Sequence, residues 1–277
     1  MKLKELLGKT ITKLKENNIE EANSKARRLL SFTLNVSKEY LIINNEIEIS
    51  EENINKYNDN IEQLIEGKPI QYIIGKQEFM GIDFFVSEDV LIPQPDTEIL
   101  AEETLKLAKT LKNPKILDLC TGSGAIAISI AENIQEAEVF ASDISKKALE
   151  VAKKNDKNSK VQFIESDLFE NIKNKFDIIV SNPPYIKTEE IKKLSKEVQN
   201  EPTLALNGGE DGLYFYKKII GDAHKYLNKD GFLCLEIGDD QKEEVIDLIK
   251  LSEKYTNIKT FKDLAGNDRV IICEKFC

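Results

Sequence analysis

The chain has 277 residues, 41% of them hydrophobic and 32% charged, which is enough apolar material for one sizeable core and a smaller second one. An excess of 49 acidic over 39 basic residues gives a formal net charge of −10, which repels nucleic-acid phosphate and argues against tight, non-specific binding to DNA. The cysteines form no Cys-x-x-Cys pair and only one histidine accompanies them, so we expect no structural zinc site; they are Cys120, Cys234, Cys273 and Cys277.

Residues 1–70 have the spacing of a small helical bundle. Apolar side chains recur at intervals of three and four residues from Leu3 to about Leu64, and the asparagine pairs at 17–18 and 44–45 mark breaks between helices. Ser50 precedes acidic residues and is placed to cap the next helix. The chain starts without an apolar leader and contains no long apolar stretch, which predicts a soluble, cytoplasmic protein.

Residues 71–92 change to β-branched and aromatic side chains punctuated by Gly75 and Gly81, and Pro93 and Pro95 close the segment. This composition predicts a β-hairpin that connects two domains. We expect the second domain to cover residues 93–277.

Short apolar runs alternate with helical patterns from Lys115 onward. The alternation predicts a doubly wound α/β domain with a mostly parallel sheet, and two runs around Gly266 and Asn267 predict a terminal antiparallel hairpin. The expected strands are 116–119, 139–141, 161–164, 176–180, 232–237, 256–263 and 269–275. In such sheets, ligands lie beyond the carboxyl ends of the strands.

A glycine loop follows the first of these strands and opens into a helical run. Gly122 and Gly124 let the backbone approach a ligand closely, and the pattern Gly-x-Gly-x-x-Ala that ends at Ala127 also fits a dinucleotide site. The second strand ends at Asp143, where a carboxylate accepts hydrogen bonds from both hydroxyls of a ribose. These features leave S-adenosylmethionine and NAD as alternatives.

Asp118, at the end of the first strand, distinguishes between these two candidate cofactors. A carboxylate there suits the positively charged amino-acid part of S-adenosylmethionine and suits a pyrophosphate poorly. Leu168 follows the third strand, in a segment whose side chains can flank an adenine ring. We therefore favour S-adenosylmethionine.

The fourth strand delivers Asn182-Pro183-Pro184-Tyr185 to the same edge of the sheet. Prolines lack an N–H, so this turn offers carbonyl oxygens and the Asn182 side-chain oxygen as acceptors. Two acceptors that grip a planar NH2 group orient its delocalised lone pair and stabilise positive charge on the nitrogen. Tyr185 is expected to stack on the planar group. We predict methyl transfer to such a nitrogen, without a metal, with Asn182, Pro183 and Tyr185 as catalytic residues.

Together these residues resemble the peptide-chain release factor N5-glutamine methyltransferases of the HemK/PrmC type. The resemblance rests on the glycine loop, the segment from Asn182 to Tyr185, and the blocks 90–98, 201–212 and 263–269. It implies an α/β fold: a Rossmann-like class I methyltransferase domain with a mostly parallel seven-stranded sheet and a terminal antiparallel hairpin, preceded by the small helical bundle.

The resemblance also implies a reaction and a partner. The family transfers a methyl group from S-adenosylmethionine, leaving S-adenosylhomocysteine, to the amide nitrogen of the glutamine in the Gly-Gly-Gln motif of class-one release factors. We expect a monomer that recognises the release factor through its helical bundle. We expect it to form no stable complex with nucleic acid and not to bind a membrane.

Individual positions carry these roles over to this chain. Cofactor-contacting positions of the family match Gly122, Gly124, Asp143, Leu168 and Asn182, and its glutamine-binding positions match Asn182, Pro183, Pro184 and Tyr185. The expected cofactor set is completed by Asp118, Cys120, Thr121 and Ser123. Four positions depart from the family. Where the family has arginine, glycine, tryptophan and aspartate, this chain has Gln94, Cys120, Leu168 and Asn207, respectively.

A nucleobase methyltransferase that acts on adenine N6 or guanine N2 of DNA or rRNA is the main alternative, because those NH2 groups are equally planar. The acidic charge and the presence of only three arginines favour a protein acceptor. An NAD oxidoreductase leaves Asn182 to Tyr185 unexplained, and a non-catalytic adaptor is expected to have lost Asn182 or the glycine loop.

Overall fold

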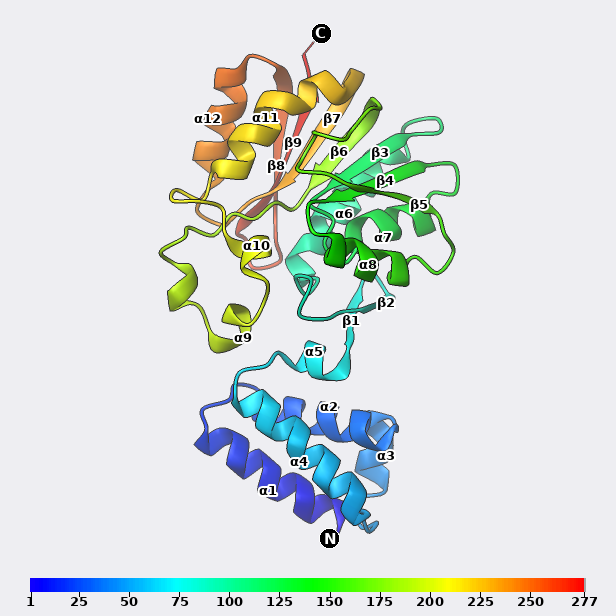
Figure 1. The fold of residues 1–277 in the computed structure, drawn as a ribbon, viewed down its shortest axis with the longest axis vertical. Helices are drawn as coiled ribbons and strands as arrows, with labels where there is room; N and C mark the ends of the chain where they lie inside the picture. The colour runs from blue at the N-terminus through cyan, green and yellow to red at the C-terminus, as the bar shows by residue number, and fades with distance from the viewer. Residues whose placement is uncertain (277) are drawn as a thin grey trace. The chain divides into compact units, whose positions relative to one another are not determined.

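The computed structural model describes residues 1–276, and Cys277 lies outside the described residues. The chain divides into two compact units, each described here by itself (Figure 1). The first unit comprises Met1–Gly75 together with Ser195–Asn200, and the second comprises Lys76–Leu194 and the chain from Glu201 onward. None of the helices in the described chain is both long and apolar enough to cross a membrane.

The first unit is a bundle of helices around its own apolar core. Its helices are α1 (Leu3–Glu16), α2 (Ala22–Leu34), α3 (Lys38–Ile43), α4 (Glu51–Ile65), α5 (Ile70–Ile74) and α9 (Lys196–Gln199). The predicted cap is present, because the Ser50 side chain accepts a hydrogen bond from Asn53 N at 3.3 Å. Tyr57 is fully buried between the helices, and its hydroxyl donates to the Ala26 carbonyl at 3.0 Å. The hydroxyl therefore has a partner inside the core.

The expected hairpin is shorter than its sequence suggested. Residues 70–74 form the short helix α5, and only Lys76–Phe79 (β1) and Ile82–Phe85 (β2) pair as antiparallel strands. Pro69 precedes the helix and Gly75, with φ of +75°, ends it. Apolar residues at helical spacing pack into the bundle core, and this packing overrides the strand propensity of the isoleucines.

The second unit contains the predicted seven-stranded sheet, in the order β5-β4-β3-β6-β7-β9-β8. All neighbouring pairs from β5 to β7 are parallel, and β9 runs antiparallel to both β7 and β8. The strands are β3 (Lys115–Leu119), β4 (Glu138–Asp143), β5 (Val161–Glu165), β6 (Phe176–Ser181), β7 (Leu227–Glu236), β8 (Tyr255–Lys262) and β9 (Asp268–Lys275). The predicted α/β fold with a terminal antiparallel hairpin is thus confirmed.

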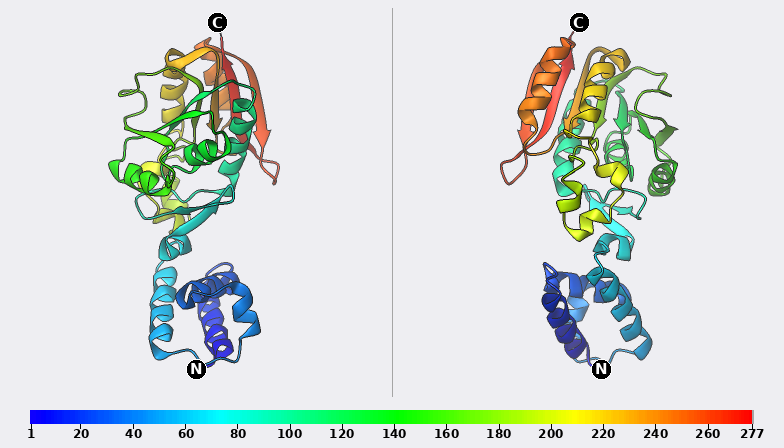
Figure 2. Two further views of the ribbon diagram at one scale, coloured as in Figure 1. Left: turned by 90° about the vertical axis from the view of Figure 1, so that its right-hand side faces the viewer. Right: turned by 60° about the vertical axis from the view of Figure 1, so that its left-hand side comes forward.

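Helices lie on both faces of the sheet (Figure 2), and each face packs in an apolar layer of its own. Successive residues of β3 face opposite sides: Ile116 packs in the layer with α6 and α7, whereas Leu117 and Leu119 pack in the layer with α11 and α12. The helical segments that the structure describes in this unit are α6 (Pro95–Ala108), α7 (Ala125–Asn133), α8 (Lys146–Asn155), the 3-10 turn η1 (Ile191–Lys193), α10 (Thr203–Leu206), α11 (Tyr214–Tyr226) and α12 (Lys242–Ser252).

The strand order reverses between β3 and β6, and this reversal positions the site. Chain segments leave these neighbouring strands in different directions, which opens a crevice at their carboxyl ends. Leu119 pairs with Ser181 of β6 and with Ser142 of β4. The glycine loop, Asp143 and Asn182 therefore follow three adjacent strand ends.

Candidate active site

A cavity of about 290 Å³ lies at these strand ends, within the second unit. Its size and largely apolar wall are those of a small-molecule site. The loops after β3, β4, β5 and β6 all contribute to it, as do α10 and the beginning of α11. Six of the residues predicted from the sequence line the cavity: Cys120, Gly122, Asp143, Leu168, Asn182 and Pro184.

Gly122 brings the backbone to the cavity. It has φ of +54°, and a Cβ added there would meet no atom within 4 Å, so nothing of the protein covers it. Gly124, with φ of +81°, serves a different purpose: a Cβ there would come within 2.8 Å of Ile128 Cδ1 and 3.1 Å of Ala152 Cβ. Gly122 thus leaves room for a ligand, whereas Gly124 lets α7 and α8 pack closely.

Cys120 and Leu168 line the cavity in the backbone conformation that favours glycine. Their φ values are +59° and +46°, respectively. The left-handed conformation explains why glycine is suited to the position of Cys120. Burial raises the pKa of the Cys120 thiol well above its ordinary value, so the thiol is neutral.

Asp143 holds the glycine loop and faces the cavity. Its Oδ2 accepts from Gly122 N at 2.9 Å and its Oδ1 accepts from Ser145 N at 2.8 Å. Burial raises its pKa, and the backbone hydrogen bonds oppose that rise. Each carboxylate oxygen has a further lone pair, so the side chain can accept hydroxyl donors from a ligand in the cavity.

Asp118 lies behind the cavity wall and not in it. Its Oδ2 accepts from Thr121 Oγ1 at 2.6 Å and from Ala127 N at 3.2 Å, so the side chain ties the glycine loop to the start of α7. Its Oδ1 is buried and has no hydrogen-bond partner among the described residues. Ser123 and Gly124 are likewise outside the cavity lining. Direct cofactor contacts of Asp118, Thr121, Ser123 and Gly124 therefore stay predictions.

The buried Asp118 carboxyl makes stability depend on pH. Burial raises its pKa from 3.8 to about 7, although hydrogen bonds from Thr121 and Ala127 lower it. Since the folded-state pKa lies above the ordinary value, the protonated form stabilises the fold fully below about pH 4, and this contribution is lost as the pH rises through about 7.

We therefore expect Asp118→Asn to weaken the fall in unfolding free energy between about pH 4 and pH 8. Urea denaturation at a series of pH values measures this dependence. Glu236, whose pKa burial also raises to about 7, keeps part of the slope in the variant. Equal slopes for the two proteins would show that Asp118 has an ordinary pKa in the fold.

The segment after β6 presents Asn182 and Pro184 to the cavity. Asn182 Nδ2 donates to Thr97 Oγ1 at 3.0 Å, which leaves the Asn182 Oδ1 atom as the acceptor of the amide. Pro183 is buried and is not part of the lining. The strand end therefore supplies the hydrogen-bond acceptor that a planar NH2 group requires.

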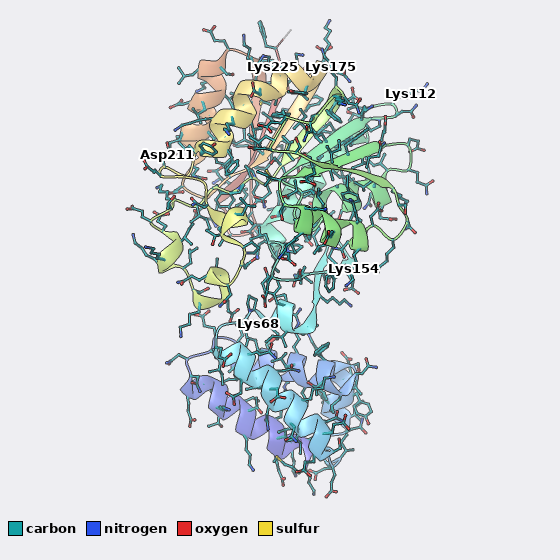
Figure 3. The ribbon with its side chains drawn as sticks, viewed as in Figure 1. Lys68, Lys112, Lys154, Lys175, Asp211 and Lys225 are labelled. Atoms are coloured by element: carbon teal, nitrogen blue, oxygen red, sulfur yellow. The ribbon has the colours of Figure 1, made fainter. Side chains whose placement is uncertain are left out.

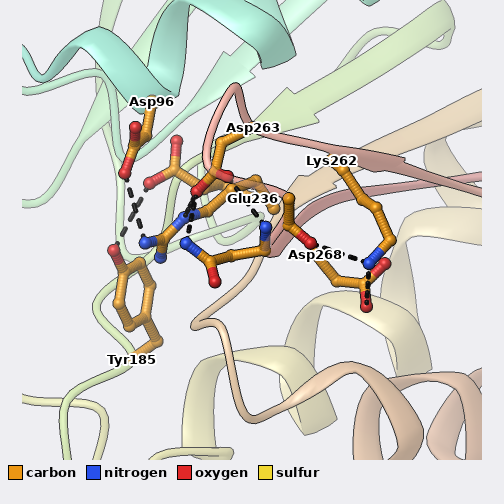
Figure 4. A network of polar contacts seen from close by, with 9 residues as sticks. Asp96, Tyr185, Glu236, Lys262, Asp263 and Asp268 are labelled. Atoms are coloured by element: carbon orange, nitrogen blue, oxygen red, sulfur yellow. Dashed lines mark hydrogen bonds and ion pairs between the residues drawn. The ribbon is translucent and has the colours of Figure 1, made fainter.

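The Tyr185 side chain is directed toward Glu236 and is not part of the cavity lining. Its ring is outside the cavity lining, and its hydroxyl donates to Glu236 Oε1 at 3.4 Å, in the polar network of Figure 4. Burial raises the pKa of the Tyr185 hydroxyl, and the negative charge of Glu236 raises it further. The partly buried phenol thus turns toward a polar partner inside the protein, and the expected stacking of Tyr185 on the acceptor group stays a prediction.

The block 201–212 packs directly on the backbone that follows Asn182. Ile186 N donates to the Leu206 carbonyl at 2.9 Å, and Gly208 N donates to the Ile186 carbonyl at 2.8 Å. The buried Gln241 side chain joins the same segments, donating to the carbonyls of Tyr185 at 3.0 Å and Gly212 at 3.3 Å. This block therefore braces the turn that carries Asn182.

The same block also contributes to the cavity. Pro202, Leu204 and Ala205 are in its lining. Asp211, labelled in Figure 3, pairs with Lys217 on the exposed side of the block, away from this lining. The block thus contributes cavity wall near its start, whereas Asp211 near its end is exposed.

Gly212 is the tightest point of this brace. A Cβ added there would lie 2.5 Å from the Tyr185 carbonyl oxygen and 2.7 Å from Gln241 Nε2. We expect Gly212→Ala to lower the free energy of unfolding by about 1–3 kcal/mol more than Gly81→Ala does. Gly81 is a matched control, since its φ of +75° is close to the +74° of Gly212 and a Cβ there meets nothing within 4 Å. Chemical denaturation compares the variants, and equal losses would refute the steric brace.

Sequence reasoning missed three polar side chains around this turn: Thr97, Glu236 and Gln241. Only Thr97 carried a signal, because it lies in the block 90–98 that supports the family resemblance. Glu236 ends β7 and is almost completely buried, which is unusual for a carboxylate. In the expected strand 232–237, Glu236 is one charged residue among apolar ones, and the sequence pattern does not show which polar partners the fold places around it.

Two family models match the chain. The "Methyltransferase small domain" matches residues 95–266, and the "PrmC N-terminal domain" matches residues 5–75. Together they account for the α/β unit and the helical bundle.

Curated relatives match over almost the whole chain. A release factor glutamine methyltransferase of Clostridium acetobutylicum is 43% identical over 280 residues, covering 98% of each chain. A protein of the same name from Thermodesulfovibrio yellowstonii is 42% identical over 276 residues, covering 96% of this chain and 98% of its own. Among solved structures, a methyltransferase of Pyrococcus furiosus superposes with a TM-score of 0.52 at 21% identity, covering 79% of this chain and 100% of that one, which shows a shared fold.

Proposed function

The chain belongs to the release factor glutamine methyltransferase family, and we propose that it methylates the side-chain amide nitrogen of the glutamine in the Gly-Gly-Gln motif of class-one release factors. The methyl donor is S-adenosylmethionine. The observation that carries the proposal is the amide of Asn182, which presents an oxygen acceptor to a cavity beside the glycine loop.

The residues of the cavity fit the methyl donor. Gly122 leaves open space, and the Asp143 carboxylate keeps lone pairs for ribose hydroxyls. Ile144 and Leu168 supply apolar wall that suits an adenine. When bound, S-adenosylmethionine supplies a methyl group on a positively charged sulfur.

The substrate nitrogen needs help that Asn182 can give. The lone pair of an amide nitrogen is delocalised into the carbonyl, so the free amide is a poor nucleophile. Asn182 Oδ1 accepts a hydrogen bond from one N–H of the substrate amide. This hydrogen bond orients the nitrogen and stabilises positive charge as the new N–C bond forms. As the N–C bond forms and the bond from the methyl group to sulfur breaks, the nitrogen becomes positively charged and its N–H becomes acidic, so the proton passes to water and no ionisable base is required at this atom.

We also propose that the helical bundle recognises the release factor. In support, α3 exposes apolar side chains, with Ile42 63% and Ile43 79% exposed. We expect Ile42→Glu combined with Ile43→Glu to raise KM for the release factor about tenfold and to leave kcat unchanged. Leu251→Glu is the control, because Leu251 is 80% exposed on α12 of the other unit. An unchanged KM in the double variant would refute this surface.

The function is tested by transfer of labelled methyl from S-adenosylmethionine to purified, unmethylated release factor. Matched samples contain a release factor with Gln→Ala in the Gly-Gly-Gln motif, duplex DNA or ribosomal RNA. Label on the intact release factor alone supports the proposal. Label on nucleic acid alone would instead support the nucleobase alternative, and label on the Gln→Ala protein would place the methyl group on another residue.

A further inference from the structure

Three consecutive side chains in the first turn of α6 each hold a different part of the second unit. Asp96 pairs with Arg269 at 3.2 Å, Thr97 accepts from Asn182, and Glu98 accepts from Met80 N at 2.6 Å. Of the three, only Thr97 contacts a residue of the cavity wall. Val90 and Leu91 of the block 90–98 line the cavity, and the helical end of the block reaches the cavity wall through the Thr97 hydroxyl, to which the proposed reaction gives no role.

The Thr97 hydroxyl stands between an amide and a carboxylate. On one side, Asn182 Nδ2 lies 3.0 Å from Thr97 Oγ1. On the other, the Thr97 hydroxyl lies near enough to the Glu236 carboxyl to lower its pKa, and the buried Oε2 atom of that carboxyl has no hydrogen-bond partner among the described residues. An ionised carboxylate only accepts hydrogen bonds, and a hydroxyl has a single hydrogen to give. In this structure Thr97 Oγ1 accepts the N–H of Asn182, and the unpartnered Glu236 Oε2 is an acceptor toward which the Thr97 hydrogen can turn.

The positive charge of Arg269 favours the ionised form of Glu236, which accepts hydrogen bonds. Arg269 lowers the pKa of the Glu236 carboxyl, which burial otherwise raises. Arg269 is itself held by Asp263, with Nε 3.1 Å from Oδ2, and by Asp96 (Figure 4). The blocks 90–98 and 263–269 therefore meet at this guanidinium. Arg269 favours the ionised form of the buried Glu236 carboxyl, whereas the negative charge of Asp96 raises the pKa of that carboxyl and opposes the effect.

We propose that Thr97 is a positioning residue that fixes which atom of the Asn182 side chain faces the substrate. Because Thr97 accepts the N–H of Asn182, the amide cannot rotate by half a turn without placing its oxygen against the lone pairs of Thr97. Only Oδ1 is left for the acceptor site. The site then favours a substrate group that donates hydrogen bonds, such as a glutamine amide, over one that only accepts them, such as a glutamate carboxylate. This inference rests on the proposed function.

The experiment compares Thr97→Val, Thr97→Ser and Thr104→Val in the full-length protein at pH 8, above the pKa of about 7 to which burial raises the Glu236 carboxyl. Valine keeps the branched shape and removes the hydroxyl, whereas serine keeps the hydroxyl. Thr104 is equally buried, two turns further along α6, with its hydroxyl beside the Cys234 thiol, so Thr104→Val controls for the loss of a buried hydroxyl from this helix.

We expect Thr97→Val to lower kcat for release factor methylation about tenfold, the equivalent of one lost hydrogen bond. Thr97→Ser should restore most of the activity, and Thr104→Val should keep it. The dissociation constant of S-adenosylhomocysteine, measured by calorimetry, should be the same in all four proteins. A kcat of Thr97→Val equal to that of the wild type would overturn the proposal, as would an equal loss in Thr97→Ser.

A second readout separates orientation from general damage. A release factor with Gln→Glu in the Gly-Gly-Gln motif serves as a competitive inhibitor of methylation of the unaltered protein. We expect it to inhibit the wild type weakly and Thr97→Val about tenfold more strongly relative to substrate KM, because a freed amide can turn its NH2 toward the carboxylate. An unchanged ratio would overturn the specificity role. If the wild type fails to methylate the release factor, the proposed function fails first, and the two failures are thereby distinguished.

Discussion

We expect Asn182→Ala to lower kcat for methyl transfer by about 10²–10³-fold while the protein stays folded and binds S-adenosylhomocysteine with unchanged affinity. The magnitude is that of losing one preorganised polar group at a centre where charge develops. Asn182 supplies the acceptor oxygen at the cavity, and its removal leaves the amide nitrogen of the substrate without a partner that orients it. Steady-state kinetics with the release factor, together with calorimetry for the cofactor product, measures both effects.

The matched control for this variant is Asn133→Ala, which removes an exposed side-chain amide near the end of α7, away from the cavity. Its activity should equal that of the wild type. Full activity in Asn182→Ala would remove the proposed role of this side chain. A parallel loss of cofactor affinity would instead mean that Asn182 acts mainly by binding the methyl donor.

Asp143→Ala should weaken the binding of S-adenosylmethionine about 10- to 100-fold. The charged acceptor makes hydrogen bonds worth about 1.5–3 kcal/mol each, and the change also releases the backbone N–H groups of Gly122 and Ser145 that the carboxylate now holds. The glycine loop then loses the conformation that borders the cavity. Calorimetric titration gives the dissociation constant directly.

Asp222→Ala is the control for this change, because Asp222 is an exposed carboxylate on α11 that pairs only with Lys225 among the described residues. It should leave cofactor affinity unchanged. If the dissociation constant of Asp143→Ala also matched that of the wild type, the ribose of the donor would have to lie elsewhere in the cavity.

Local sequence patterns predicted most of the secondary structure and the class of fold. The alternation of short apolar runs and helical spacing predicted the parallel sheet, and each of the expected strands in residues 116–275 is present within a few residues of its expected limits. Residues 71–74 were expected in a hairpin, because isoleucine-rich segments favour strands. Residues 70–74 instead form a helix, because their apolar side chains pack against the bundle core. The glycine loop was predictable because its function depends on backbone conformation.

The candidate site was only partly predictable. Strand ends indicated that Gly122, Asp143 and Asn182 would meet, and the cavity brings them together. The positions of strand ends do not predict the direction in which each side chain points. Asp118 turns into the protein to hold Thr121, and Tyr185 turns toward Glu236, because each buried polar group needs a partner that only the surrounding elements supply.

The sequence by itself determined the class of fold, the place of the site at the carboxyl edge of the sheet, and the chemical group at Asn182, because periodicity and turn chemistry act over a few residues. The tertiary structure decided how that group is oriented. Thr97 and Asn182 are 85 positions apart, and Gln241 and Tyr185 are 56 apart. Such pairs form only where the strand order brings chain ends side by side, so the hydrogen bonds that fix the acceptor atom belong to the fold and not to any one segment.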